Sequence, residues 1–180
     1  RLFNRPFDRG GRIAASGMIN RPLLDHLIEA LFFAGRTVST GREAFGTRLV
    51  DEMVAFGRRR KVAPADLMAT AAELTVVGIV RAVKRVVSHD RSLRALHLMG
   101  GGRHNRHFCR RLTEELNGLD VRAVDELGID GDLVEASAYA VMAAACVRSE
   151  ALPMIPRRGK DDRLRPILGR IAQPPVRVHS

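Results

Sequence analysis

The sequence predicts a helix-rich α/β fold with a short sheet. In the middle of the chain, the apolar run of Leu96, Leu98 and Met99 has the length of a strand, and three glycines separate it from a segment with helical spacing. On both sides of this centre, apolar residues recur at helical intervals over long segments. Of the 180 residues 46% are hydrophobic, so we expect one domain with a sizeable core.

The central glycines, Gly100, Gly101 and Gly102, support two interpretations. Glycine has no Cβ, so its backbone N–H groups can come close to a ligand, and the start of the following helix carries partial positive charge that suits a phosphate. The three residues could instead form a tight strand-to-helix connection. Neither the dinucleotide-binding pattern nor the P-loop pattern is present, so the glycines alone slightly favour the plain connection.

Ahead of the centre, the sequence predicts loops and helices in alternation. Residues 1–11 are basic and polar and read as a loop, and Asn20 is a good N-cap for a helix with a stripe of Leu23 and Leu27. His26 lies on that stripe and is expected to be a packed or rim histidine.

A second glycine-bearing loop, Arg36–Glu43, leads into an amphipathic helix that carries Phe45 and Met53 and stops around Gly57. Ser39 and Thr40 could cap this helix, which is the favoured interpretation, or their hydroxyl groups could face a ligand.

A longer helix follows from about residue 63 to residue 87, and the charged run Arg58–Lys61 is expected to connect the two helices. Charged residues within this long helix, Glu73 and Arg81 among them, exclude a membrane span.

Beyond the glycines, a short strand is expected at Val121–Val124, followed by an acidic loop at 125–132 and a helix at Leu133–Val147. That helix is apolar on every face, which predicts burial. Glu135 is the only charge inside it, and a buried carboxylate needs partners. It could accept hydrogen bonds from the helix N-terminus or face a polar ligand, and the two readings weigh about equally.

Charge and cysteine content set further limits. The net charge is +10, but the basic tail at 151–180 has no aromatic residue and several prolines, so we expect a poorly ordered tail and no nucleic-acid partner. Two cysteines, with no signal peptide or membrane run, favour a cytoplasmic protein. No metal site is expected, because a helix would point Cys109 away from His104 and His107. The first residue is arginine, which suggests a segment of a longer protein.

Four stretches together resemble the C-terminal half of the anhydro-N-acetylmuramic acid kinase family, which belongs to the actin-like ATPase and sugar-kinase superfamily. Their order and spacing agree with the family from about residue 7 to residue 147. They are Phe7–Gly17, Ser39–Phe45, Gly100–Asn105 and the block from Asp125 to Ala136.

The resemblance implies that residues 1–150 form the second lobe of a ribonuclease H-like kinase. It also implies ATP and Mg²⁺ as cofactors and an anhydro amino sugar as substrate, and it leaves a homodimer open. Gly100, Gly101, Gly102 and Asn105 would border the nucleotide, and Glu135 would reach toward the sugar. The cleft loop would be formed by Ser39, Thr40, Gly41 and Arg42.

This chain also departs from the family pattern. Arg103 replaces a small residue after the glycines, where it could crowd or recharge the nucleotide site, and Arg36–Val38 replaces Pro-Pro-Lys. The catalytic aspartate of the family belongs to the N-terminal half, so we expect no catalytic residue and no turnover in this chain alone. The alternative is a degenerate, non-catalytic module that binds a nucleotide or a partner.

Overall fold

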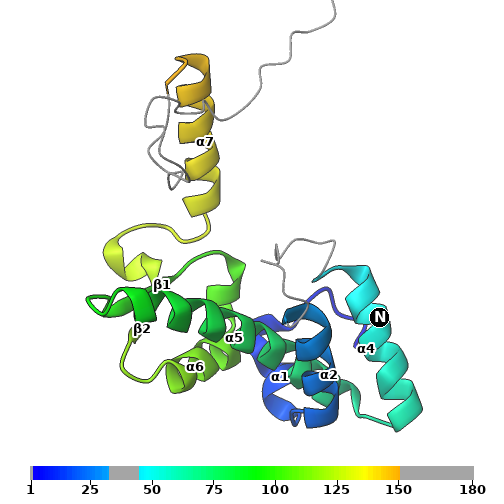
Figure 1. Ribbon diagram of the computed structural model, residues 1–180. Coiled ribbons are helices and arrows are strands. Elements are labelled where there is room, and N and C mark those ends of the chain that lie inside the picture. The colour runs from blue at the N-terminus through cyan, green and yellow to red at the C-terminus, as the bar shows by residue number, and fades with distance from the viewer. Residues whose placement is uncertain (1, 33–44, 151–180) are drawn as a thin grey trace, which may run out of the picture.

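The computed structural model describes residues 2–32 and 45–150. Figure 1 shows a helical body around the long helix α5, with a small sheet on one side and α7 standing away from the body. The elements in chain order are η1 (Arg9–Gly11), α1 (Arg12–Ser16), α2 (Arg21–Phe32), α4 (Thr47–Arg60), α5 (Pro64–His89), β1 (Ala95–Leu98), η2 (Gly101–His104), α6 (Arg106–Glu115), β2 (Asp120–Ala123), η3 (Val124–Leu127) and α7 (Val134–Val147).

The N-terminal helices pack on the first half of α5. As predicted, Asn20 caps α2, since its Oδ1 accepts a hydrogen bond from the Leu23 N–H at 3.0 Å. His26 lies at the rim, 2.8 Å from Glu52. The apolar faces of α2, α4 and α5 form one core cluster, whose buried members are Leu23, Leu24, Leu27, Met53, Leu67 and Leu74.

The sheet has two parallel strands, β1 and β2, paired from Ala95–Asp120 to Leu98–Ala123. Helix α6 connects them, as a parallel pair requires. The second half of α5 packs against α6 and both strands, and this second cluster is centred on Val76, Val80, Leu112 and Leu116. The predicted helix-rich α/β fold with a short sheet is therefore confirmed.

Three boundaries differ from the prediction, the first being the strand expected at Val121–Val124, which lies at Asp120–Ala123. The charged run at 58–61 was expected to be a connection, but Arg58–Arg60 form the last turn of α4, because arginine is a good helix former and the helix ends only at Lys61, which has a positive φ. Met99 lies past the end of β1 and is exposed.

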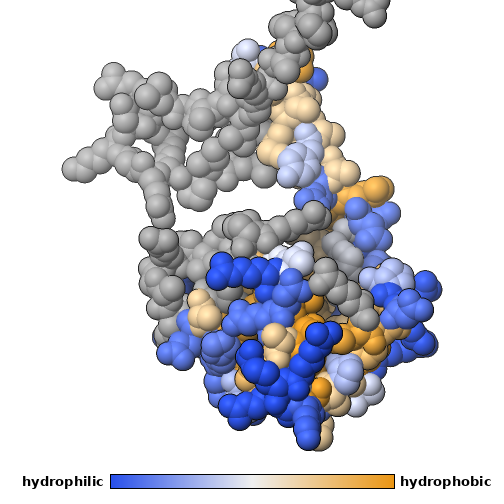
Figure 2. All heavy atoms as spheres, turned by 90° about the vertical axis from the view of Figure 1, so that its right-hand side faces the viewer, coloured by the Kyte–Doolittle hydropathy of each residue, from blue (hydrophilic) through white to orange (hydrophobic). Residues whose placement is uncertain are grey.

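The predicted burial of the last helix is wrong. Helix α7 forms where expected, but Tyr139, Val141 and Val147 are 62%, 54% and 72% exposed, and in this fully described helix Ala145 alone is buried. Figure 1 shows the reason, because α7 stands clear of the described body. Figure 2 shows pale to deep orange apolar atoms at the top of the view, where α7 lies. An apolar surface becomes buried only when another surface covers it. None of the described helices is long and apolar enough to span a membrane.

Candidate functional site

The glycine turn lies at the carboxyl end of β1, where the chain passes into η2. Gly100 has a φ of 72°, a conformation that favours glycine, and its N–H donates to the Gly131 carbonyl at 2.9 Å. Gly101 and Gly102 are exposed, and a Cβ on any of the three glycines would meet no atom within 4 Å. Internal packing therefore does not demand glycine at Gly101 or Gly102, and their backbone faces open space.

The N–H groups of this turn are available to a ligand. Across residues 2–32 and 45–150, no acceptor is found for the N–H of Gly101 or Gly102. Asn105, which follows this turn, caps α6: its Oδ1 accepts a hydrogen bond from the Phe108 N–H at 2.9 Å. The turn and the start of α6 thus form one fixed unit.

Arg103 joins this turn to the acidic loop that follows β2. Its side chain is 5% exposed and donates to both carboxylate oxygens of Asp125, at 2.7 and 3.0 Å. It also donates to Asp132 and, at 3.1 Å, to the carbonyl of Gly100. The side chain that could have crowded the nucleotide space is instead turned toward the loop.

These ion pairs lower the pKa values of two aspartates in the acidic loop. The hydrogen bond from Arg103 holds the pKa of Asp125 below its ordinary value. Hydrogen bonds first from Arg103 and then from His104 lower the pKa of Asp132 to about 2. Both carboxylates therefore stay ionised at neutral pH and hold the arginine in place.

The N-terminal segment meets the start of α6 beside the turn. The Asp8 carboxylate accepts from the N–H groups of Ile13 and Ala14 at 2.9 and 3.0 Å and so holds the start of α1. A Cβ on Gly11 would lie 1.9 Å from Asn105 Oδ1, so only glycine allows this close approach. An open basic hollow adjoins this contact and is lined by Phe7, Arg9, Gly10, Arg12, His104 and Arg106.

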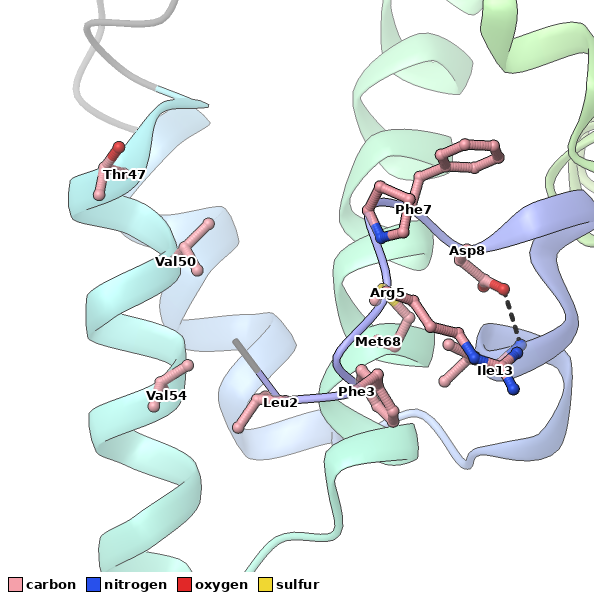
Figure 3. A pocket seen from close by; sticks show the side chains of 11 residues that line it. Leu2, Phe3, Arg5, Phe7, Asp8, Ile13, Thr47, Val50, Val54 and Met68 are labelled. Carbon is pink, nitrogen blue, oxygen red and sulfur yellow. Dashed lines mark hydrogen bonds between the residues drawn. The ribbon is translucent and has the colours of Figure 1, made fainter.

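A second hollow lies between the N-terminal segment and the helices α4 and α5 (Figure 3). Its volume is about 410 Å³, and Phe3, Val50, Val54 and Met68 give it an apolar lining. Its one carboxylate, Asp8, is already engaged by the N–H groups of α1. No sequence pattern predicted this groove, and it offers packing surface and no reactive group.

The remaining predicted site residues do not join the turn. Glu135 lies in the first turn of α7 and is exposed, so the expectation of a buried carboxylate is wrong for the same reason as the expected burial of α7. Ser39, Thr40, Gly41 and Arg42 lie outside the described residues. Among the residues that are described, no group of three or more His, Cys, Asp or Glu side chains is arranged to hold a metal ion.

Comparison with known proteins decides the family. Residues 1–173 match the sequence model of the family described as anhydro-N-acetylmuramic acid kinase. The chain belongs to this family. The resemblance carried by the four sequence stretches is therefore confirmed.

Individual family members show how much of the protein is present. The chain is 35% identical to the anhydro-N-acetylmuramic acid kinase of Salinibacter ruber, over 82% of the chain and 37% of that relative. It is 32% identical to the enzyme of that name from Legionella pneumophila, over 79% of the chain and 37% of the relative. The chain thus spans little more than a third of the length of these kinases.

Sequence reasoning missed three ion pairs at and behind the turn: Arg103 with Asp125, Arg103 with Asp132, and Arg111 with Glu73. Asp125 and Asp132 follow Arg103 by 22 and 29 positions in the sequence, and Glu73 and Arg111 are 38 positions apart. An arginine directly after the glycines and aspartates clustered at 125–132 were a visible signal of opposite charge. Only the parallel pairing of β1 and β2 brings them together.

Proposed function

We propose that this chain supplies the nucleotide-facing part of an ATP-dependent kinase that acts on 1,6-anhydro-N-acetylmuramic acid. The reaction would phosphorylate the 6-oxygen of the sugar while water opens the anhydro ring, giving N-acetylmuramic acid 6-phosphate for peptidoglycan recycling in the cytoplasm. The observation that carries the proposal is the open glycine turn at the end of β1, in a chain of this kinase family.

In this proposal, residues 1–150 are the second lobe of an actin-like kinase and residues 151–180 are a separate tail. A parallel βαβ unit with a glycine turn at the strand end fits such a lobe. Ligands in open α/β sheets bind beyond the carboxyl ends of the strands, which is where Gly100–Gly102 lie.

The residues present fit a nucleotide at this turn. The open space in front of Gly101 and Gly102 would let their N–H groups approach it, and Asn105 would keep α6 in place beside it. ATP supplies the phosphoryl group when bound. Glu135 is proposed to reach the sugar, and the loop of Ser39, Thr40, Gly41 and Arg42 to border the cleft. No group of three or more metal-ligating side chains lies among the described residues, and we assign no Mg²⁺ ligand to them.

Turnover should require more than this chain. Phosphoryl transfer depends on positioning both substrates, and one lobe presents only part of that arrangement. The exposed apolar surface of α7 would be covered by the rest of the kinase. We therefore expect the isolated chain to bind nucleotide weakly and to phosphorylate no sugar. Measurable phosphorylation by the isolated chain would contradict this expectation.

A non-catalytic nucleotide- or partner-binding module is the second candidate. The replacement of a small residue by Arg103 favours it, since the family pattern is altered beside the proposed nucleotide. Restored sugar phosphorylation after adding the remaining part of a relative's kinase would favour the enzyme over the module.

The test is a calorimetric titration with ATP and Mg²⁺ of the unchanged chain and of Gly101→Glu. Because Gly101 is exposed and a Cβ there meets no atom within 4 Å, this variant should fold normally and lose binding through charge repulsion. Val86→Glu, at an exposed position of α5, is the charge-matched control and should bind as the unchanged chain does. Equal binding by Gly101→Glu would show that the nucleotide does not use the turn.

A further inference from the structure

Arg103 contacts three separate parts of the chain at once. Its Nε and Nη2 donate to Asp125, where the acidic loop begins, and its Nη1 donates both to Asp132, near the loop's end, and to the Gly100 carbonyl in the turn. All three guanidinium nitrogens therefore have acceptors within the chain. Four of its five N–H groups donate within the chain, and Nη2 also lies 3.7 Å from Asp130, so the guanidinium is directed at the acidic loop.

The fit around this side chain is close. It is 5% exposed, although the aspartates around it are roughly half exposed, at 44% for Asp125 and 55% for Asp132. A Cβ on Gly131 would lie 2.5 Å from Arg103 Nε, so the loop backbone packs directly on the guanidinium. A rigid, planar group with several paired donors fixes the geometry of what it touches more strongly than a lysine would.

The backbone repeats the same connection. The Gly100 N–H donates to Gly131 at 2.9 Å, and the Arg103 N–H donates to Gly100 at 3.2 Å. The hydrogen bond from Gly100 to Gly131 and the arginine side chain join the turn to the loop, and the hydrogen bond from Arg103 to Gly100 closes the turn itself. No other cation among the described residues pairs with Asp125, so removing the guanidinium would leave that carboxylate with only the Gly131 N–H, at 3.5 Å, from the loop backbone.

We propose that Arg103 is a positioning residue for the nucleotide: its guanidinium ties the Gly100–Gly102 turn to Asp125 and Asp132, so the turn already has its binding shape before the nucleotide arrives. The proposal rests on the proposed function. If only a fraction of molecules holds the competent shape, the apparent dissociation constant rises by the inverse of that fraction. A turn that is competent one-tenth of the time would bind about tenfold more weakly.

The experiment has two readouts on the same variants, Arg103→Ala and Arg103→Lys. The first is hydrogen exchange of the Gly100 amide without nucleotide, which reports the connection between turn and loop directly because this amide donates to Gly131. The second is the ATP affinity by calorimetry, well below the unfolding temperature. Arg103→Ala should speed exchange and weaken ATP binding about tenfold or more. Arg103→Lys keeps the charge but loses the planar guanidinium with its several donors, so its exchange rate and ATP affinity should lie between those of the unchanged chain and of Arg103→Ala.

Two further variants separate positioning from charge and from general destabilisation. Asp125→Asn with Asp132→Asn keeps Arg103 but weakens its anchors, so it should also speed Gly100 exchange and weaken ATP binding. Arg110→Ala removes another paired arginine, whose side chain is 57% exposed and whose carboxylate partner is Glu114, and it should change neither readout.

Three outcomes would overturn the proposal. Unchanged Gly100 exchange in Arg103→Ala would show that the arginine does not shape the turn. Faster exchange with unchanged ATP affinity would show that the shape does not matter for binding, and the proposed function would stand. No ATP binding by the unchanged chain would remove the proposed nucleotide site itself, and with it a role for Arg103 toward the nucleotide.

Discussion

Arg111 of α6 donates from Nε and Nη2 to the two carboxylate oxygens of Glu73 in α5, at 3.0 and 2.8 Å. Glu73 is 4% exposed and Arg111 is 17% exposed, so water screens this pair little. The hydrogen bond to Glu73 is the main cause that raises the pKa of Arg111. The pair joins α6, which follows the glycine turn, to the scaffold helix α5.

Removing one partner of this pair should destabilise the fold strongly. Glu73→Ala leaves Arg111 partly buried with only Glu114 and Glu115 as partners, and breaking a buried pair costs at most about 3–5 kcal/mol. The combined change Glu73→Leu with Arg111→Met should cost far less, because no charge is left buried. Urea unfolding measures both variants. Asp120→Asn, at the exposed ion pair with Arg122, is the control and should cost below about 1 kcal/mol. A Glu73→Ala cost equal to that control would contradict the prediction.

Gly10 and Gly11 offer a matched pair of substitutions. Both have positive φ, 66° and 70°, so alanine should cost each about 1–2 kcal/mol of conformational strain. A Cβ on Gly10 meets open space, whereas one on Gly11 would overlap Asn105 Oδ1. Gly11→Ala should therefore lower the free energy of unfolding clearly more than Gly10→Ala in denaturant melts. Equal effects would mean that the contact between Gly11 and Asn105 does not persist in solution.

Thr70 fixes the loop that leads into α2. Its hydroxyl oxygen accepts from the Asn20 N–H at 2.9 Å, and the residue is fully buried. Thr70→Val keeps the shape but leaves that N–H without an acceptor, which should cost about 1–3 kcal/mol in urea unfolding. Thr70→Ser retains the hydroxyl and should keep the hydrogen bond. A valine variant as stable as the serine variant would contradict this assignment.

The acidic loop should respond to pH through Asp132. Its pKa in the folded chain is about 2, below the ordinary value, so its ion pairs favour folding above pH 4 and this contribution disappears as the pH falls toward 2. In Arg103→Ala the pKa of Asp132 should return toward its ordinary range. Carbon-detected NMR titration of the carboxyl group measures it in both proteins. A pKa near 2 that persists without Arg103 would show that another group holds this carboxylate.

The sequence by itself determined the local structure and the family. The Asn20 cap, the helical stripes of α2, α4 and α5, and the order of strand, glycine turn and helix are all written in neighbouring residues, because capping and periodicity act over a few positions. The collinear motifs likewise identified the family, which the match over residues 1–173 confirms. None of this required knowing which elements pack together.

Tertiary structure alone decided the partners. Arg103 reaches Asp125, and Arg111 reaches Glu73, only because strand pairing and helix packing bring distant segments together. The same reason explains why the predicted burial of α7 is wrong. A helix that is apolar on every face can be buried, but it is buried only where other parts of the protein cover it. Short-range sequence patterns predict the local structure of each segment, whereas ion pairing and burial depend on side chains contributed by other segments of the chain.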